Sequence, residues 1–240
     1  MNSVCITIDV DWAPDFAIAP MAERLLATGV KATWFITHPS PALEMLRRHP
    51  DVFELGIHPN FLPGSTHGST PVEVLGHCLT LVPEAASLRT HALFQSTPLW
   101  DLVLESGQLK IDSSLYLPHQ EHLRPILYHR GRRALWRVPI FWEDDLEMDR
   151  PAPLWDADDL LALGPGLKVF DFHPWHVFLN SSDMAPYQTM KKLFPRLHQA
   201  DQAVASDHRR SGPGAGSLFH DLTARLSGRG EAITISEAIA

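Results

Sequence analysis

The chain has 240 residues, of which 45% are hydrophobic and 20% are charged, and its formal net charge is −8. This is the composition of a globular protein, which excludes disordered, collagen-like and coiled-coil chains. The negative charge disfavours nucleic acid and anionic membrane surfaces as partners.

Short apolar runs rich in β-branched residues alternate with segments of helical periodicity along the chain. In chain order, the expected strands are residues 4–10, 31–37, 52–57, 88–91, 109–112, 126–129, 134–138, 168–172 and 233–235. The expected helices are residues 15–29, 42–48, 71–82, 99–106, 156–163, 186–200 and 218–226, with a glycine-rich loop at 206–217. This alternation predicts an α/β fold with a mostly parallel sheet, either a barrel or a doubly wound sheet.

No clear linker divides the sequence, so we expect a single domain over residues 1–240. The two cysteines, Cys5 and Cys78, lie in apolar patterns and cannot build a disulfide framework. The first residues lack the basic segment of a secretory signal. No apolar run reaches the roughly 18 residues of a membrane span. We therefore expect a cytoplasmic protein.

Polar side chains stand at the carboxyl ends of four predicted strands, where parallel α/β folds bind their ligands. They are Asp9 and Asp11 at the end of the first strand, His58 after the third, Arg89 and His91 in the fourth, and His173 after the strand at 168–172. The convergence of carboxylate, imidazole and guanidinium groups on one rim indicates a functional site.

Asp9 and Asp11 are two residues apart on a strand, so their side chains share one face. Two carboxylates at one rim repel each other unless a cation lies between them or one of them is protonated. Turn formation before Pro14 explains the pair equally well.

Pro59 ends the third strand and leaves His58 at the rim, as a metal ligand or a structural residue. His67 is nine residues further along, and the turn at 63–64 can fold the segment back to the same ion. One aspartate with two histidines suits Zn²⁺, with Co²⁺ or Mn²⁺ as the other candidates.

Five segments, in this order, carry a resemblance to a known family: ITIDVDWAP, KATWFIT, FELGIHPNF, LRTHALF and VFDFHPWH. Over residues 3–180 the chain resembles the polysaccharide deacetylases, the NodB-like carbohydrate esterases. It is similar in particular to members encoded among genes for bacterial surface-polysaccharide (O-antigen) biosynthesis. The resemblance implies a distorted (β/α) barrel of about seven mostly parallel strands and metal-dependent hydrolysis of acyl groups on sugars.

The resemblance also assigns roles by position. It makes Asp9 the general base and Asp11 a metal ligand, although Val10 separates two aspartates that are adjacent in the family. Arg89 would pair with the base and keep it ionised. His173 would be the general acid that protonates the departing amine.

The same resemblance makes His58 a metal ligand. Position 62 is leucine where the family has its second histidine, so His67 would take that place from a longer loop. The predicted ligand set is therefore Asp11, His58 and His67, around a divalent metal that is Zn²⁺ by preference.

Four residues near the rim are candidates for contact with a sugar: Trp12, Asn60, Trp142 and Trp175. Aromatic rings can stack on sugars, although core packing is their more common role. The expected function is removal of an N-acetyl group from an amino sugar, free or linked to a nucleotide or lipid, during surface-polysaccharide biosynthesis. Two alternatives are a deformylase or other amide hydrolase, and a carbohydrate-binding protein on a decayed enzyme scaffold.

Overall fold

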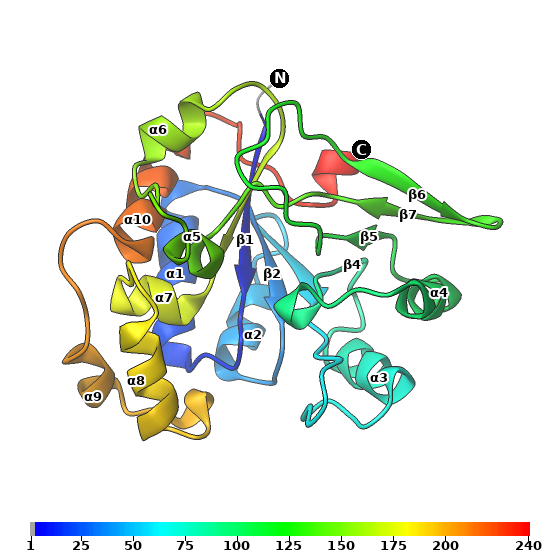
Figure 1. Cartoon of the computed structure of the whole chain (residues 1–240), viewed down its shortest axis with the longest axis horizontal. Coiled ribbons are helices and arrows are strands. Elements are labelled where there is room, and N and C mark those ends of the chain that lie inside the picture. Colours follow the sequence, from blue (N-terminus) through cyan, green and yellow to red (C-terminus); the bar gives the residue numbers. More distant parts are fainter. Residues whose placement is uncertain (1–2) are drawn as a thin grey trace.

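The computed structural model describes residues 3–240, which form a nine-stranded sheet curled into a half-barrel (Figure 1). The strands are β1 (Val4–Asp9), β2 (Ala32–Ile36), β3 (Phe53–Ile57), β4 (Ser87–Leu88), β5 (Ile111–Asp112), β6 (Ile126–Arg130), β7 (Arg133–Arg137), β8 (Trp142–Glu143) and β9 (Lys168–Phe172). Their order is β6-β7-β5-β4-β3-β2-β1-β9-β8, and only β6 and β7 pair antiparallel. The predicted distorted barrel is confirmed, with more strands than expected.

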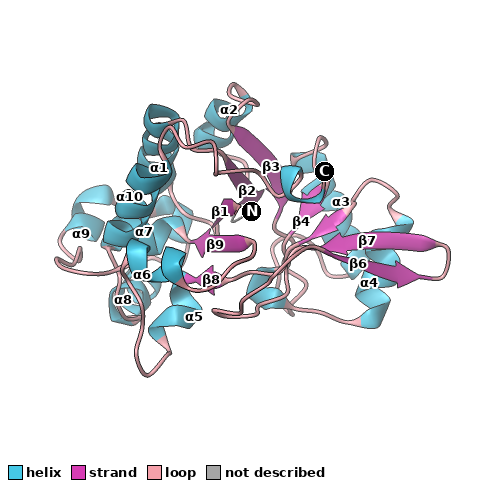
Figure 2. Cartoon of the chain, turned by 90° about the horizontal axis from the view of Figure 1, so that it is seen from above, coloured by secondary structure: helices cyan, strands magenta, loops and turns pink. Residues whose placement is uncertain are grey.

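Ten α-helices surround the sheet in the described part of the chain. They are α1 (Asp15–Thr28), α2 (Pro41–Arg47), α3 (Pro71–Leu81), α4 (Thr97–Glu105), α5 (Asp144–Met148), α6 (Ala157–Ala162), α7 (Pro174–Leu179), α8 (Ala185–Leu193), α9 (Gln202–Ser206) and α10 (Ala215–Leu226). Seen from above, α1, α7 and α10 pack together on one side, and the β6–β7 hairpin projects from the opposite end (Figure 2).

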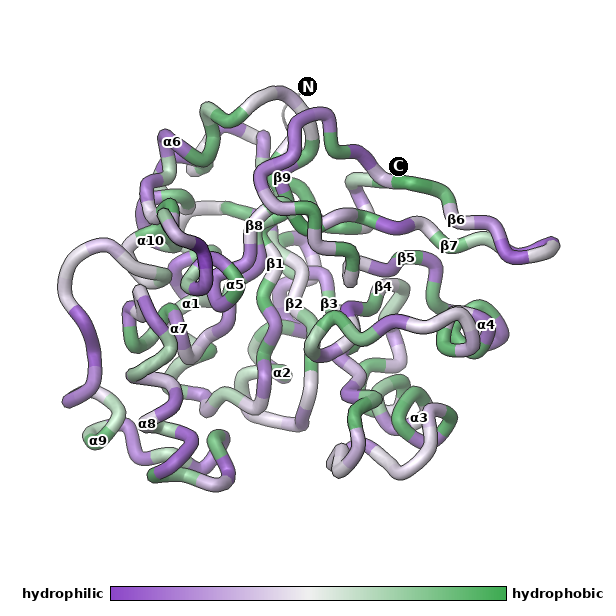
Figure 3. Tube along the Cα trace, in the orientation of Figure 1, coloured by the Kyte–Doolittle hydropathy of each residue, from purple (hydrophilic) through white to green (hydrophobic). Residues whose placement is uncertain are grey.

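The core forms around the central strands. β1, β2 and β9 are buried along their whole length, as expected for parallel strands covered on both faces. Apolar residues are concentrated in these strands, whereas the tip of the β6–β7 hairpin is polar (Figure 3). The rigid centre of the sheet therefore fixes the strand ends that carry the candidate site.

Three expected elements differ in the structure. The helix expected over 186–200 ends at Leu193, because a residue before a proline, here Phe194, disfavours helical geometry. The strand expected over 88–91 ends at Leu88, and a 3₁₀ turn over His91–Leu93 follows. In place of a strand at 233–235, an isolated bridge joins Val4 to Ala232, the residue just before that segment. No helix within residues 3–240 has the length and apolar character needed to cross a membrane.

Candidate metal centre and active site

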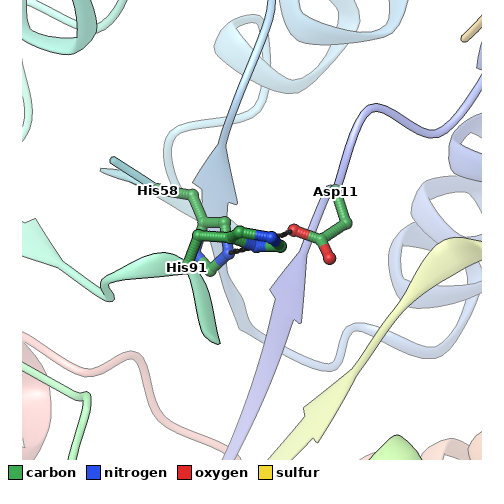
Figure 4. A group of neighbouring side chains, drawn as sticks. All are labelled: Asp11, His58 and His91. Atoms are coloured by element: carbon green, nitrogen blue, oxygen red, sulfur yellow. Dashed lines mark hydrogen bonds and ion pairs between the residues drawn. The ribbon is translucent and has the colours of Figure 1, made fainter. Parts of the chain in front are cut away.

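Three side chains that follow β1, β3 and β4 meet at the carboxyl edge of the sheet (Figure 4). Asp11 follows β1, His58 follows β3, and His91 opens the 3₁₀ turn after β4. Asp11 Oδ1 lies 3.1 Å from His58 Nε2 and 3.0 Å from His91 Nδ1, and the two ring nitrogens are 3.3 Å apart. The side chains of Asp11 and His91 are 14% and 25% exposed, so the cluster is open to solvent on one side.

The three atoms fit a divalent cation. Zn²⁺ bonds of about 2.0–2.1 Å in tetrahedral geometry place two ligand atoms about 3.3 Å apart, close to the separations observed. His58 Nδ1 is buried without a hydrogen-bond partner and lies 3.5 Å from Asp9 Oδ2. A carboxylate there favours the proton on Nδ1 and leaves Nε2 free to bind a metal. The residues present therefore suit a metal held by Asp11, His58 and His91.

Local backbone strain aims Asp11 at the cluster. Asp11 and Trp12 both have left-handed backbones, with φ of 43° and 53°, a conformation that costs on the order of 1 kcal/mol per non-glycine residue. The Trp12 N–H donates to Thr37 Oγ1 at 3.0 Å, which helps to hold the turn. Burial disfavours the Asp11 carboxylate, but the charge of His91 and hydrogen bonds from both rings hold the pKa of Asp11 well below its usual range.

The structure places His67 outside this cluster, which corrects the predicted ligand set. His67 Nε2 donates to the carbonyl of Thr37 at 2.8 Å, and Nδ1 accepts from the backbone N–H of Asn60 at 3.2 Å. Its ring packs on Trp12 and stacks on His77. Both ring nitrogens of His67 form local hydrogen bonds, so His67 holds the segment around Asn60 and is not part of the cluster.

The buried His67 predicts a loss of stability in acid. Burial lowers the pKa of His67 to about 4, from about 6.5 in an unfolded chain. The unfolded state therefore binds more protons between these values, and stability falls as pH drops from 6.5 towards 4. At pH 5 the His67 contribution to the free energy of unfolding should be reduced by about 2 kcal/mol.

Urea unfolding at pH 7 and pH 5 measures this effect. The variant His67→Gln cannot titrate, so its free energy of unfolding should change less between the two pH values than that of the wild-type chain. An identical pH dependence in both proteins would contradict this role of His67.

Arg89 is a buried cation inside the half-barrel and is 0% exposed. Its Nη1 donates to Asp9 Oδ1 at 3.0 Å and to Thr7 Oγ1 at 2.9 Å, and it also pairs with Asp171. Its Nε donates to the carbonyl of Ser113 at 2.8 Å. Burial opposes the charge on Arg89, but Asp171 and Asp9 raise the pKa of the guanidinium. Arg89 thus holds the two carboxylates beneath the metal cluster.

His173 faces the metal cluster from the end of β9 and is held by Asp144, which begins α5. The His173 ring donates from Nδ1 to Asp144 Oδ1 at 2.6 Å, and its backbone N–H donates to Asp144 Oδ2 at 2.9 Å. The other ring nitrogen, Nε2, lies 3.9 Å from Asp11 Oδ2. Burial favours the neutral ring, but the charge and hydrogen bond of Asp144 raise the pKa of His173 well above its ordinary value.

Further carboxylates surround His173. Glu143, Asp144 and Asp145 follow one another in the chain, and Glu143 and Asp144 are buried, so this acidic stretch is not a solvated loop. Burial, followed by the charges of Asp145 and Asp171, raises the pKa of Glu143 well above its usual range. The side of the site that holds His173 is therefore lined with acidic residues.

The four predicted sugar contacts have different surroundings. Trp142 is fully buried among Trp155, Phe170 and Phe172, so the structure makes it a core residue and not a sugar contact. Trp175 is also buried, but it lines a cavity of about 20 Å³ next to Asp11 and His173. Trp12 and Asn60 line a separate, more open groove beside the metal cluster.

Two residues were absent from the predicted site. His91 stands two positions after Arg89 in the segment Arg89-Thr90-His91, and this strand-end placement is the signal that could have identified it. Asp144 follows β8, which pairs in parallel with β9. The sequence signal for the Asp144–His173 pair is a carboxylate just after one strand and a histidine just after the strand beside it.

The candidate metal ligands lie at the carboxyl edge of a curled, mostly parallel sheet and face a histidine from a neighbouring strand. This arrangement agrees with the class that the sequence motifs predicted, the polysaccharide deacetylases. The model of one family in this class, described as WbmS-like polysaccharide deacetylase, matches residues 6–191. The chain belongs to this family. No curated protein sequence is similar enough to match it.

Solved structures agree with this assignment. A candidate polysaccharide deacetylase involved in O-antigen biosynthesis from Bordetella bronchiseptica is 31% identical, with 92% of this chain and 90% of that chain covered and a TM-score of 0.79. The peptidoglycan deacetylase PdaC from Bacillus subtilis is 10% identical over 99% of this chain and 90% of that chain, with a TM-score of 0.51. A CE4 family pseudoenzyme from Bacillus anthracis is 15% identical over 100% and 66%, with a TM-score of 0.50. The last two similarities show the fold alone.

Proposed function

We propose that this chain is a metal-dependent hydrolase that removes a small N-acyl group from an amino sugar during O-antigen biosynthesis. The observation that carries the proposal is the Asp11, His58 and His91 cluster, faced by the paired His173 and Asp144. The 31% identical Bordetella protein, described as acting in O-antigen biosynthesis, supports the biological setting.

Asp11, His58 and His91 would hold the metal. A divalent ion bound there would polarise the acyl carbonyl and lower the pKa of a bound water. Asp9 would accept the proton of the attacking water as general base. Burial, opposed by the charge of Arg89, raises the pKa of Asp9, which increases its affinity for a proton. Its Oδ1 bond to Arg89 fixes the carboxylate in place.

His173 would supply the proton on the opposite side of the reacting amide. The nitrogen of an amide leaves as an amine only when it is protonated, so the reaction needs an acid at this point. Asp144 holds the His173 ring by Nδ1, which leaves Nε2 directed at the Asp11 side of the site. The Asp144 carboxylate also keeps the ring protonated, as a general acid requires.

The enclosed cavity beside Asp11, His173 and Trp175 supports a small acyl group. Its volume of about 20 Å³ is space for about one water-sized group. An acetyl methyl group fits such a space, and so does the hydrogen of a formyl group. A longer acyl chain would have to displace the buried side chains of Trp175 or His176.

The test is acyl release from N-formyl, N-acetyl and N-butyryl amino sugars by the chain loaded separately with Zn²⁺, Co²⁺ or Mn²⁺. We expect acetate release and at least about tenfold slower release of butyrate, the effect of about 1.4 kcal/mol of steric cost. Formate release at a much higher rate than acetate would identify a deformylase. The absence of release from a folded, metal-loaded chain would favour the carbohydrate-binding alternative, which predicts sugar binding that Asp9→Asn leaves unchanged.

A further inference from the structure

A groove of about 270 Å³ opens beside the metal cluster, beginning at Trp12, the residue after Asp11. One wall contains Trp12, Asn60 and Thr66, and the other contains Arg196, Leu197 and His198 from the segment after α8. The strained turn at Asp11 and Trp12 therefore connects the metal cluster to the groove, since Asp11 belongs to the cluster and the adjacent Trp12 lines the groove. A molecule whose amide lies at the metal can extend into this groove.

The groove differs in its ionisable residues from the side of the site that holds His173, which is lined with acidic residues. No aspartate or glutamate is among its lining residues in the described chain, although the net charge of the protein is −8. The Arg196 side chain is exposed, and within residues 3–240 its guanidinium forms no ion pair. The ring of His198 lies beside that of His38, with centroids 5.7 Å apart.

Uncharged hydrogen-bond donors complete the groove. The side-chain oxygen of Asn60 accepts from the N–H of Leu62 at 2.9 Å, which leaves the Asn60 amide NH₂ group as a donor. Thr66 adds a hydroxyl. The ring of Trp12 lies 5.3 Å, centroid to centroid, from the rings of both His67 and His91, so the folded loop holds it in place. Hydrogen-bond donors beside an unpaired guanidinium suit an oxyanion.

We propose that this groove binds a phosphate carried by the sugar substrate, as in a sugar linked through phosphate to a nucleotide or a lipid carrier. The proposal rests on the proposed function for the position of the amide at the metal. The acylated nitrogen enters the acidic, metal-binding side, and the phosphate lies against Arg196. Arginine is favoured for this role because its planar guanidinium can donate two parallel hydrogen bonds to phosphate oxygens.

Calorimetry on the metal-loaded full chain tests the proposal with deacylated probes, which cannot turn over. The probes are glucosamine 1-phosphate and glucosamine. We expect the phosphate to tighten binding by roughly three- to tenfold, since Arg196 is exposed and solvent screens its charge. Arg196→Ala should abolish this advantage, Arg196→Lys should keep part of it, and the binding of glucosamine should be the same in all three proteins.

Arg132→Ala is the matched control, because Arg132 is an exposed arginine in the turn of the distant β6–β7 hairpin. It removes the same charge and should leave the advantage intact. Amino sugars linked to uridine diphosphate or to a short prenyl diphosphate then identify the carrier, and tighter binding of either one supports the proposal.

Three results would overturn it: equal binding of both probes by the wild-type chain, an advantage that survives Arg196→Ala, or an equal Arg196-dependent advantage for an amino-uronic acid, which would make this a carboxylate site. Because the probes need no turnover, failure of the deacylation assay leaves this test intact. Conversely, a chain that deacylates but binds both probes equally rejects only the phosphate site.

Discussion

Replacing His173 by alanine should lower kcat for deacylation by about 10²–10⁴-fold, the usual contribution of a general acid, while the metal content stays unchanged. His173 is not among the three residues that form the proposed metal cluster, and its Nε2 lies 3.9 Å from Asp11 Oδ2. KM should change little, because the proton is needed in the transition state and not for binding.

The variant Asp144→Asn tests whether Asp144 keeps His173 protonated. In the wild-type chain, Asp144 outweighs burial and raises the pKa of His173. Without that carboxylate the ring loses its proton at lower pH, so the basic limb of the kcat profile should shift to lower pH and kcat at neutral pH should fall. A purely structural role for Asp144 would reduce the amount of folded protein without moving the limb.

The control is His119→Ala. His119 also faces a buried carboxylate, with Nε2 3.0 Å from Glu147 Oε2, but it is outside the proposed catalytic set. Its removal should leave kcat within about threefold of the wild-type value. A His173→Ala variant that keeps its metal and most of its kcat would exclude His173 as the general acid.

Much of the site could be predicted because it depends on one rule of parallel sheets, that the carboxyl ends of the strands meet at one edge. Asp11, His58 and His173 each follow a strand that the sequence marks clearly, and the structure brings all three to that edge. Arg89 could be located in the same way, since it follows β4.

For the third member of the cluster, the strand-end rule offered His91, but closeness in sequence to His58 favoured His67. His67 is close to His58 in the sequence, but its loop uses both ring nitrogens in local hydrogen bonds. His91 is 33 residues from His58, and it reaches the cluster because β4 is only two residues long and ends in a 3₁₀ turn. The length of a short strand depends on its neighbours in the sheet, which the sequence of the segment does not specify.

Which tryptophans line the site could not be predicted, for a different reason. Trp142 and Trp12 both lie at strand ends and have the same side chain, but Trp142 is buried and Trp12 lines an open groove. The difference arises from packing. β8 lies beside β9, where Trp142 meets Phe170 and Phe172, whereas Trp12 lies in a left-handed turn beyond the end of β1.

His91→Ala should remove the bound metal, and His67→Gln should retain it. The wild-type chain, reconstituted with Zn²⁺, Co²⁺ or Mn²⁺ and measured by elemental analysis, should hold about one divalent ion per chain. Loss of a ligand from a three-residue site should weaken binding by more than the 10–100-fold typical of a residue that only supports a ligand. His58→Ala should have the same effect as His91→Ala, whereas Asp9→Asn should weaken metal binding by only about 10–100-fold.

Thermal unfolding must accompany the metal analysis, because His67 is buried and its replacement can destabilise its loop. The ligand set proposed here requires that His67→Gln binds metal at a temperature where the variant is folded. If a folded His67→Gln loses the ion and His91→Ala keeps it, His67 is the ligand and the loop over 60–67 must rearrange when metal binds. Because Trp12 packs against both rings, that rearrangement would also reshape the groove beside the site.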